Sequence, residues 1–184
     1  MKMDRIIRIT IAIAIVIGLI VIYNQYTEDP LIKAQSLADS ISSQLVSRIS
    51  NASPSNLNVI KSASILVVWS DTGKVCTDIQ ELIPSSYWPK TTDDINNGYL
   101  VGITKTTGES DRYGTSFNYV TGYQVVYAVS IVLNGQNVKE NSFAGADLPM
   151  SIRVDSSNKS TWYGAPPSNS VIADWIKTTL VQTH

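Results

Sequence analysis

The sequence predicts a mainly β protein with a single N-terminal transmembrane helix, an amphipathic stalk helix, an antiparallel β-sandwich exterior domain and a C-terminal helix. One observation behind this fold class is an unbroken apolar stretch, residues 6–23, that follows a basic leader. The other is a series of short apolar or alternating segments punctuated by turn residues, which is typical of a sandwich. The chain accordingly divides into an anchor (1–23), a stalk with its linker (24–58) and a β domain that includes the terminal helix (59–184).

The apolar stretch holds mainly isoleucine, valine, leucine and alanine, with one charge, Arg8, at its start. Its eighteen residues would cover about 27 Å as a helix, close to the thickness of a bilayer core. A cleaved signal peptide would need a small-residue site after the stretch, and a buried core helix would need a polar face; the sequence offers neither. Because basic residues precede the stretch and Glu28 and Asp29 follow it, we expect a cytoplasmic N-terminus, an extracytoplasmic C-terminal domain and the lipid bilayer as a partner.

The stalk helix is expected to begin at Pro30, with two acidic residues favourably placed before it. Its apolar residues recur every three or four positions and form one stripe. This stripe would pack on the protein's own domain, on the membrane helices of a partner, or in a pilin-like spine continuous with the anchor. The stripe consists of Ala34, Leu37, Ala38, Ile41, Leu45 and Ile49.

The clearest strand covers residues 123–133, where both alternating faces are mostly apolar, so we expect it at the centre of a sheet. Asn134 and Gly135 follow it and predict a type I′ hairpin turn. Residues 84–97 are expected to form a loop. The other predicted strands are residues 64–69, 74–79, 99–104, 151–155 and 160–163.

The C-terminal segment, residues 166–180, predicts a helix that covers an edge or an open end of the sandwich. Serines at 168 and 170 can cap its N-terminus. Its apolar face consists of Val171, Ile172, Trp175, Ile176 and Leu180.

Cysteine and histidine are too scarce for the common catalytic and metal sites. Cys76 is the one cysteine and His184 the one histidine, so the sequence provides neither a Cys–His dyad nor a zinc site. A lone cysteine of this kind is more often a small buried side chain than a reactive thiol. We therefore predict that the chain binds no metal and no cofactor of its own.

Composition argues against nucleic acid as a partner, because no basic run or aromatic-interleaved basic patch is present. Residues 24–184 are poor in charge and rich in Ser, Thr, Asn and Tyr, which together with the isoleucine-rich stretch suggests a surface protein of a thermoacidophilic archaeon. Asn51 and Asn158 match glycosylation acceptor patterns.

The segment from Thr104 to Phe117 is the most suggestive of function. Lys105 and Arg112, with the backbone amides around two glycines, could hold a small oxyanion. The alternative is an ordinary polar hairpin loop, in which Asp111 forms an Asx-turn.

A strand followed by Gly108, then Asp111-Arg112-Tyr113-Gly114 and Phe117, a long strand and an Asn-Gly hairpin resembles the small subunit of thiosulfate:quinone oxidoreductase. The resemblance covers residues 99–140. It implies a membrane-anchored extracytoplasmic subunit of a respiratory membrane complex, with a multi-span partner subunit that handles the quinone. Thiosulfate would then contact Arg112, Lys105 and the hydroxyl of Tyr113, and Cys76 is a candidate reactive thiol. Such a subunit would not be catalytic alone.

Two other hypotheses remain open from the sequence. One is a pilin-like subunit, although the Gly or Ala cleavage site and early Glu of processed pilins are missing. The other is a structural surface or envelope protein without enzymatic activity, which needs only the predicted layout. Co-purification with multi-span proteins or assembly into filaments of one chain would separate these hypotheses from the respiratory one.

Overall fold

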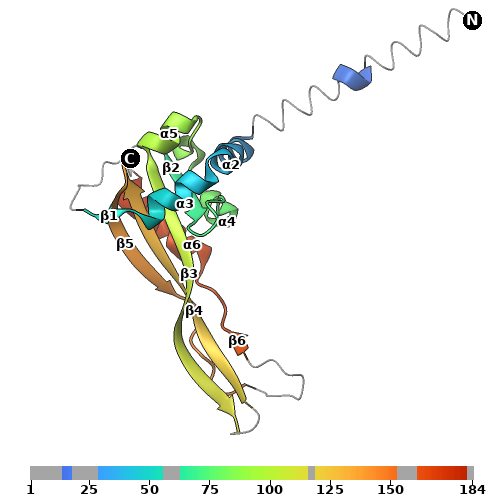
Figure 1. Cartoon of the computed structure of the whole chain (residues 1–184). Helices are drawn as coiled ribbons and strands as arrows, with labels where there is room; N and C mark the ends of the chain where they lie inside the picture. The colour runs from blue at the N-terminus through green and yellow to red at the C-terminus, as the bar shows by residue number, and fades with distance from the viewer. Residues whose placement is uncertain (1–13, 18–28, 56–62, 116–118, 153–160, 182–184) are drawn as a thin grey trace, which may run out of the picture.

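The computed structural model describes residues 14–17, 29–55, 63–115, 119–152 and 161–181. It shows a mixed α/β protein in which one six-stranded sheet carries helices on both faces (Figure 1). The predicted mainly β fold with an antiparallel sandwich is therefore wrong. The reason is that the apolar residues on the two faces of the sheet are covered by helices, so no second sheet is needed to bury them.

The sheet is mixed in strand direction, with the order β1-β5-β4-β3-β2 and β6 paired to β4. The long strands β3, β4 and β5 are antiparallel neighbours, whereas β2 runs parallel to β3. The strands are β1 (Ser53–Pro54), β2 (Ile65–Trp69), β3 (Tyr99–Gly114), β4 (Tyr119–Leu133), β5 (Gln136–Ala144) and β6 (Thr161–Tyr163). The helices are α2 (Pro30–Ser40), α3 (Ser42–Ser50), α4 (Thr77–Gln80), the 3₁₀ turn η1 (Ser85–Tyr87), α5 (Thr92–Asn97) and α6 (Asn169–Leu180).

Strand β4 lies between β3 and β5, which confirms its predicted central position. Asn134 and Gly135 have φ of 51° and 73°, as a type I′ hairpin turn requires. One face of β4 joins a core with β2, β3, α4 and α6, and the other face joins a second core with α2 and α3. The first core includes Val101, Val129, Ile131, Ile172 and Ile176, and the second includes Ala34, Leu45, Leu66, Leu100 and Val132.

The predicted single N-terminal transmembrane helix is not supported. Within the described ranges, no helix combines the length and the apolar character needed to cross a membrane. Most of the predicted span, residues 6–23, lies outside the described residues. The part that is described, residues 14–17, is helical, and Ile15, Val16 and Ile17 are each more than half exposed.

The predicted stalk helix forms as two helices, α2 and α3, with a break at Ile41 (φ −128°). Asp29 caps α2 by accepting a hydrogen bond from the Leu31 N–H at 2.9 Å, and Pro30 occupies the first turn. All six residues of the apolar stripe are buried in, or packed against, the second core. Of the three alternatives, the structure shows the stripe packing on the protein's own sheet.

The segments on either side of η1 differ from their predictions. Residues 74–79 do not form a hairpin strand: a single bridge joins Val75 to Val68, and α4 begins at Thr77. The predicted loop 84–97 contains η1 and α5. Thr91 caps α5 through a capping box, and the N–H groups of Lys90 and Thr91 both donate to the Asp94 carboxylate. These hydrogen bonds, that of Lys90 first, lower the pKa of Asp94.

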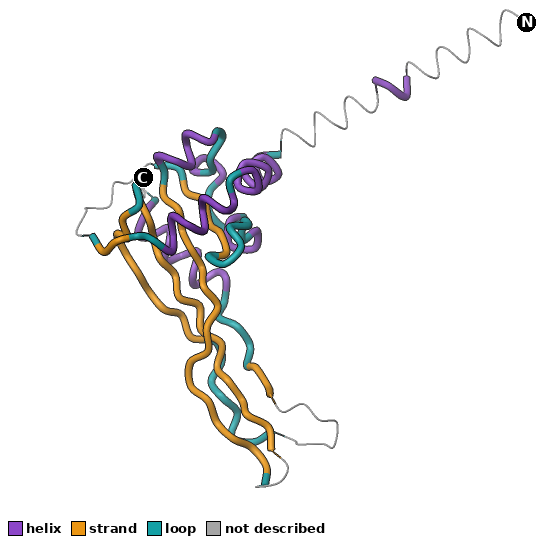
Figure 2. Tube along the Cα trace, in the orientation of Figure 1, coloured by secondary structure: helices purple, strands orange, loops and turns teal. Residues whose placement is uncertain are grey.

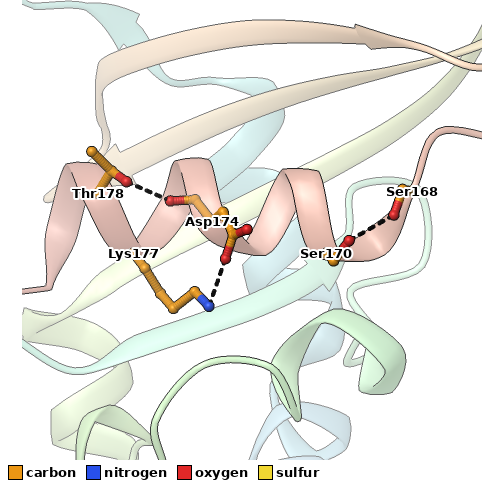
Figure 3. A network of polar contacts seen from close by, with 5 residues as sticks. All are labelled: Ser168, Ser170, Asp174, Lys177 and Thr178. Atoms are coloured by element: carbon orange, nitrogen blue, oxygen red, sulfur yellow. Dashed lines mark hydrogen bonds and ion pairs between the residues drawn. The ribbon is translucent and has the colours of Figure 1, made fainter.

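Helix α6 forms where the sequence predicts it, and four residues of its predicted apolar face lie on the first core: Ile172, Trp175, Ile176 and Leu180. The fifth, Val171, is 54% exposed. Figure 3 shows its polar contacts: Lys177 pairs with Asp174 at 2.7 Å, and the Thr178 hydroxyl donates to the Asp174 carbonyl at 2.8 Å. Strand β6 matches the predicted strand 160–163. Of the predicted strand 151–155, residues 151 and 152 are not in a strand, and the other three lie outside the described residues.

Candidate binding surface on the β arm

The β3–β4 hairpin continues well past the two cores. On β3 the buried run ends at Ile103, and the next nine residues, 104–112, are all exposed. Figure 2 shows this half of the hairpin extending away from the helices as a narrow projection. We call residues 104–114 and 119–124, together with β6, the arm. Residues 104–117 are predicted as a loop from the sequence, because polar residues at solvent-exposed positions give no hydrophobic period.

One face of the arm packs against residues 145–152 of the same chain. Tyr113 is 6% exposed, and its hydroxyl donates to the Pro149 carbonyl at 2.7 Å. A Cβ atom on Gly122 would lie 2.8 Å from the Tyr113 ring, so the close contact between them requires glycine. Gln124 donates through Nε2 to the Gly145 carbonyl at 3.3 Å. This face is therefore held by the chain itself, and burial raises the pKa of Tyr113.

The opposite face of the arm is open and rich in tyrosine. Because side chains alternate along a strand, Tyr119 and Tyr123 lie on the other side of β4 from Gly122. Tyr123 stacks on Tyr163 of β6, with ring centroids 5.8 Å apart and an interplanar angle of 27°. The Arg112 guanidinium lies 3.5 Å from the centroid of the Tyr119 ring. We call Arg112, Tyr119, Tyr123 and Tyr163 the tyrosine face; Tyr119 is 43% and Tyr163 56% exposed.

The predicted anion contacts do not converge on one point. Lys105 pairs with Tyr127 and Arg112 with Thr121, so about 20 Å of strand separates them. Tyr113 points to the packed face of the arm, whereas Arg112 stacks on the open face. Thiosulfate contact by these residues stays a prediction.

Cys76 lies in the first core and is 3% exposed. Burial raises the pKa of its thiol from the ordinary value of 9.0 to about 11; the Ile79 N–H acts in the opposite direction, and Asp78 adds to the rise. The thiol therefore stays protonated at neutral pH, and only a thiolate would be a strong nucleophile.

The remaining predicted sites are at the surface or outside the described residues. Asn51 is exposed just after α3, where its side-chain amide donates to the Ser47 hydroxyl at 3.0 Å. Asn158 lies outside the described residues. In the part of the chain that the structure describes, no group of three or more potential metal ligands is present.

A cavity of about 230 Å³ is lined by residues of the neighbouring strands β3, β4 and β5. Its walls are mostly small or hydroxylated side chains, with one carboxylate. They belong to Thr104, Ala128, Val129, Ser130, Glu140, Asn141 and Ser142.

The tyrosine face was missed by the sequence analysis. The alternation of Tyr119, Thr121 and Tyr123 before a strongly apolar strand was an available signal, since it continues the period of that strand.

Comparison of the chain with protein-family models, curated proteins and solved structures found no match.

Proposed function

We propose that this protein is a structural surface or envelope protein, without enzymatic activity of its own, that binds a partner protein through the tyrosine face. One observation carries the proposal. The arm packs one of its faces on its own chain and leaves tyrosine and arginine side chains exposed on the other.

The chemistry of this face suits a protein partner. Tyrosine and arginine are enriched among the residues that dominate binding energy at protein interfaces. Tyrosine offers a large, rigid area with a hydroxyl at its edge, so it binds without losing much conformational entropy. Arg112 adds a positive charge that would pair with a carboxylate on the partner.

The arm presents these side chains in a fixed arrangement. The hydrogen bond from Tyr113 to Pro149 on the packed face and the pairing of β6 with β4 fix the backbone of the arm. The Tyr123–Tyr163 stack and the Arg112–Tyr119 contact fix the side chains of the tyrosine face. Such preorganisation lowers the entropic cost of binding.

A location outside the cytoplasm is part of the proposal. The basic leader, the apolar stretch of residues 6–23 and the polar, charge-poor composition that follows support attachment to a lipid bilayer on its outer side. Protease added to intact cells would then digest residues 24–184. Full protection of these residues would contradict this location.

A photo-crosslinking amino acid at position 119 tests the binding function in intact cells. We expect one discrete adduct with a partner protein, and we expect Arg112→Ala or Tyr163→Ala to reduce its yield several-fold. The matched control places the same amino acid at Ser36, an exposed position on α2. An adduct of equal yield at position 36, or one that both substitutions leave unchanged, would contradict the proposal.

The respiratory-subunit hypothesis stays a prediction that depends on the resemblance of residues 99–140. It requires thiosulfate-dependent quinone reduction by a complex that contains this chain and a multi-span partner. The test compares that activity in wild type, Arg112→Ala and Cys76→Ser. Activity lost in Arg112→Ala would favour this hypothesis over a purely structural role.

A further inference from the structure

Strand β5 has an open outer edge. It forms the side of the sheet away from β2, and β1 pairs only with its first two residues, Gln136 and Asn137. From Val138 to Ala144, none of the described strands lies on its outer side. Open edges are templates for pairing with another chain.

The structure identifies which backbone groups face outward on this edge. The Gly145 N–H donates to the Val125 carbonyl at 2.7 Å, so residue 145 points its backbone groups toward β4. Because backbone groups alternate along a strand, those of Glu140, Ser142 and Ala144 point away from β4. Consistent with this direction, the Ser142 N–H donates to the side chain of Asn141 at 3.0 Å and not to β4.

The start of this edge, up to Lys139, is protected against pairing with another strand, and the rest is not. A bulge places an extra residue on β5 between Asn137 and Lys139, and bulges and lysines both discourage edge pairing. Beyond Lys139 the edge has one charged residue, Glu140, followed by Asn, Ser, Phe and Ala. The unprotected part therefore contains all three outward-facing residues.

We propose that β5 pairs antiparallel with β5 of a second copy of this chain, with Ser142 on the two-fold axis. In this register Ser142 faces Ser142 and Glu140 faces Ala144, so every outward backbone group finds a partner. A register centred on Glu140 would place two carboxylates opposite each other. A register centred on Asn141 would place Ala144 opposite the bulge at Val138.

A second copy fits this edge because the edge is complementary to itself. A two-fold axis normal to the sheet brings the same patch together twice, as closed homodimers require. The edge is a different surface from the tyrosine face, so failure of one proposal leaves the other standing.

Cysteine cross-linking tests the register in the full chain, kept in a mild detergent and carrying Cys76→Ala. Directly opposed residues of this kind have Cα atoms about 5.5 Å apart, within the range of a disulfide. Ser142→Cys should therefore give a cross-linked dimer of twice the 20.1 kDa chain mass on mild oxidation. Glu140→Cys alone should not cross-link, but should do so when mixed with Ala144→Cys chains.

Ser36→Cys on α2 is the control for random collision. Equal cross-linking at positions 36 and 142, or none at 142, would overturn the proposal; self-cross-linking at 140 would overturn the register. A cross-link from 142 to an unrelated protein in place of a second copy would overturn the choice of occupant.

Ser142→Pro provides an independent variant. It removes an outward N–H that donates to the Asn141 side chain and not to β4, so sedimentation should show a folded monomer, while Ser142→Ala stays dimeric. Dimerisation of Ser142→Pro equal to that of wild type would overturn the proposal. Substitutions in the tyrosine face should leave this dimer unchanged.

Discussion

Gln80 takes the place of a neighbouring strand at the outer edge of β2. Its side chain is fully buried, accepting from the Val67 N–H at 2.7 Å and donating to the Ile65 carbonyl at 3.2 Å. A carboxamide is the one common side-chain group that offers a donor and an acceptor in the arrangement of a peptide group. A buried backbone group without such a partner would be costly.

Gln80→Met should lower the free energy of unfolding by about 2–4 kcal/mol, because methionine keeps the length of the side chain and leaves two backbone groups unpaired. Urea denaturation measures the change. Glu81→Met, at the exposed neighbouring position, is the control and should have little effect. Equal losses in the two variants would mean that the hydrogen bonds of Gln80 contribute little.

Ionisation of Cys76 should make the free energy of unfolding depend on pH in the alkaline range. Its folded pKa of about 11 lies above the ordinary value of 9.0, so the unfolded thiol ionises first as pH rises. Stability should be level below pH 9 and fall between pH 9 and 11. Because other groups also titrate there, the measurement is the difference between wild type and Cys76→Ala in denaturation midpoint at pH 8 and pH 10.5. A difference independent of pH would contradict the assignment.

At the scale of elements, the arm is a hairpin whose stability comes from residues 145–152 and β6. Isolated two-stranded hairpins are marginal in water. The hydrogen bonds and packing behind the arm therefore explain why the tyrosine face is presented at all.

Gly122→Ala should destabilise the arm without unfolding the body. The added methyl group would lie 2.8 Å from the Tyr113 ring, and overpacking of this kind costs about 1–3 kcal/mol. We expect faster amide hydrogen exchange in residues 119–124 and unchanged exchange in α6. Thr121→Ala, on the open face, is the control. Equal acceleration in the arm and in α6 would show that they unfold as one unit.

At the scale of the whole molecule, β4 ties the two cores together. Its residues alternate between the α6 side and the α2–α3 side, so a single strand contributes to both. Loss of its packing should therefore destabilise both layers of helices together.

Ile131→Asp should cost about 3–5 kcal/mol, because it places an unpaired charge where the present side chain is fully buried. Gln136→Asp, at an exposed position in the next strand, should cost less than about 1 kcal/mol. Chemical denaturation of the two variants gives the comparison. Similar costs would mean that the burial of β4 had been misjudged.

The parts predicted well from the sequence have strong local signals. The apolar alternation of β4, the Asn134-Gly135 turn and the apolar face of α6, apart from Val171, match the structure. The overall fold did not follow from them, because strand periodicity reports burial on each face and not whether a sheet or a helix provides it. The tyrosine face depends on the pairing of β6 with β4 across some forty residues, which no local pattern records.

The closure of β2 by Gln80 also bears on how far copies of the chain can associate. In the language of polymer chemistry, a monomer with two reactive ends grows into a chain, whereas a monomer with one reactive end stops at a pair. On β2, Gln80, the Cys76 N–H, which donates to the Val67 carbonyl at 2.9 Å, and the Lys74 carbonyl, which accepts from the Trp69 N–H at 2.9 Å, bind outward-facing backbone groups and close this edge to another strand. Pairing through β5 therefore cannot continue through β2 of the next copy, and the contact joins two copies without extending the body of the sheet at its other side.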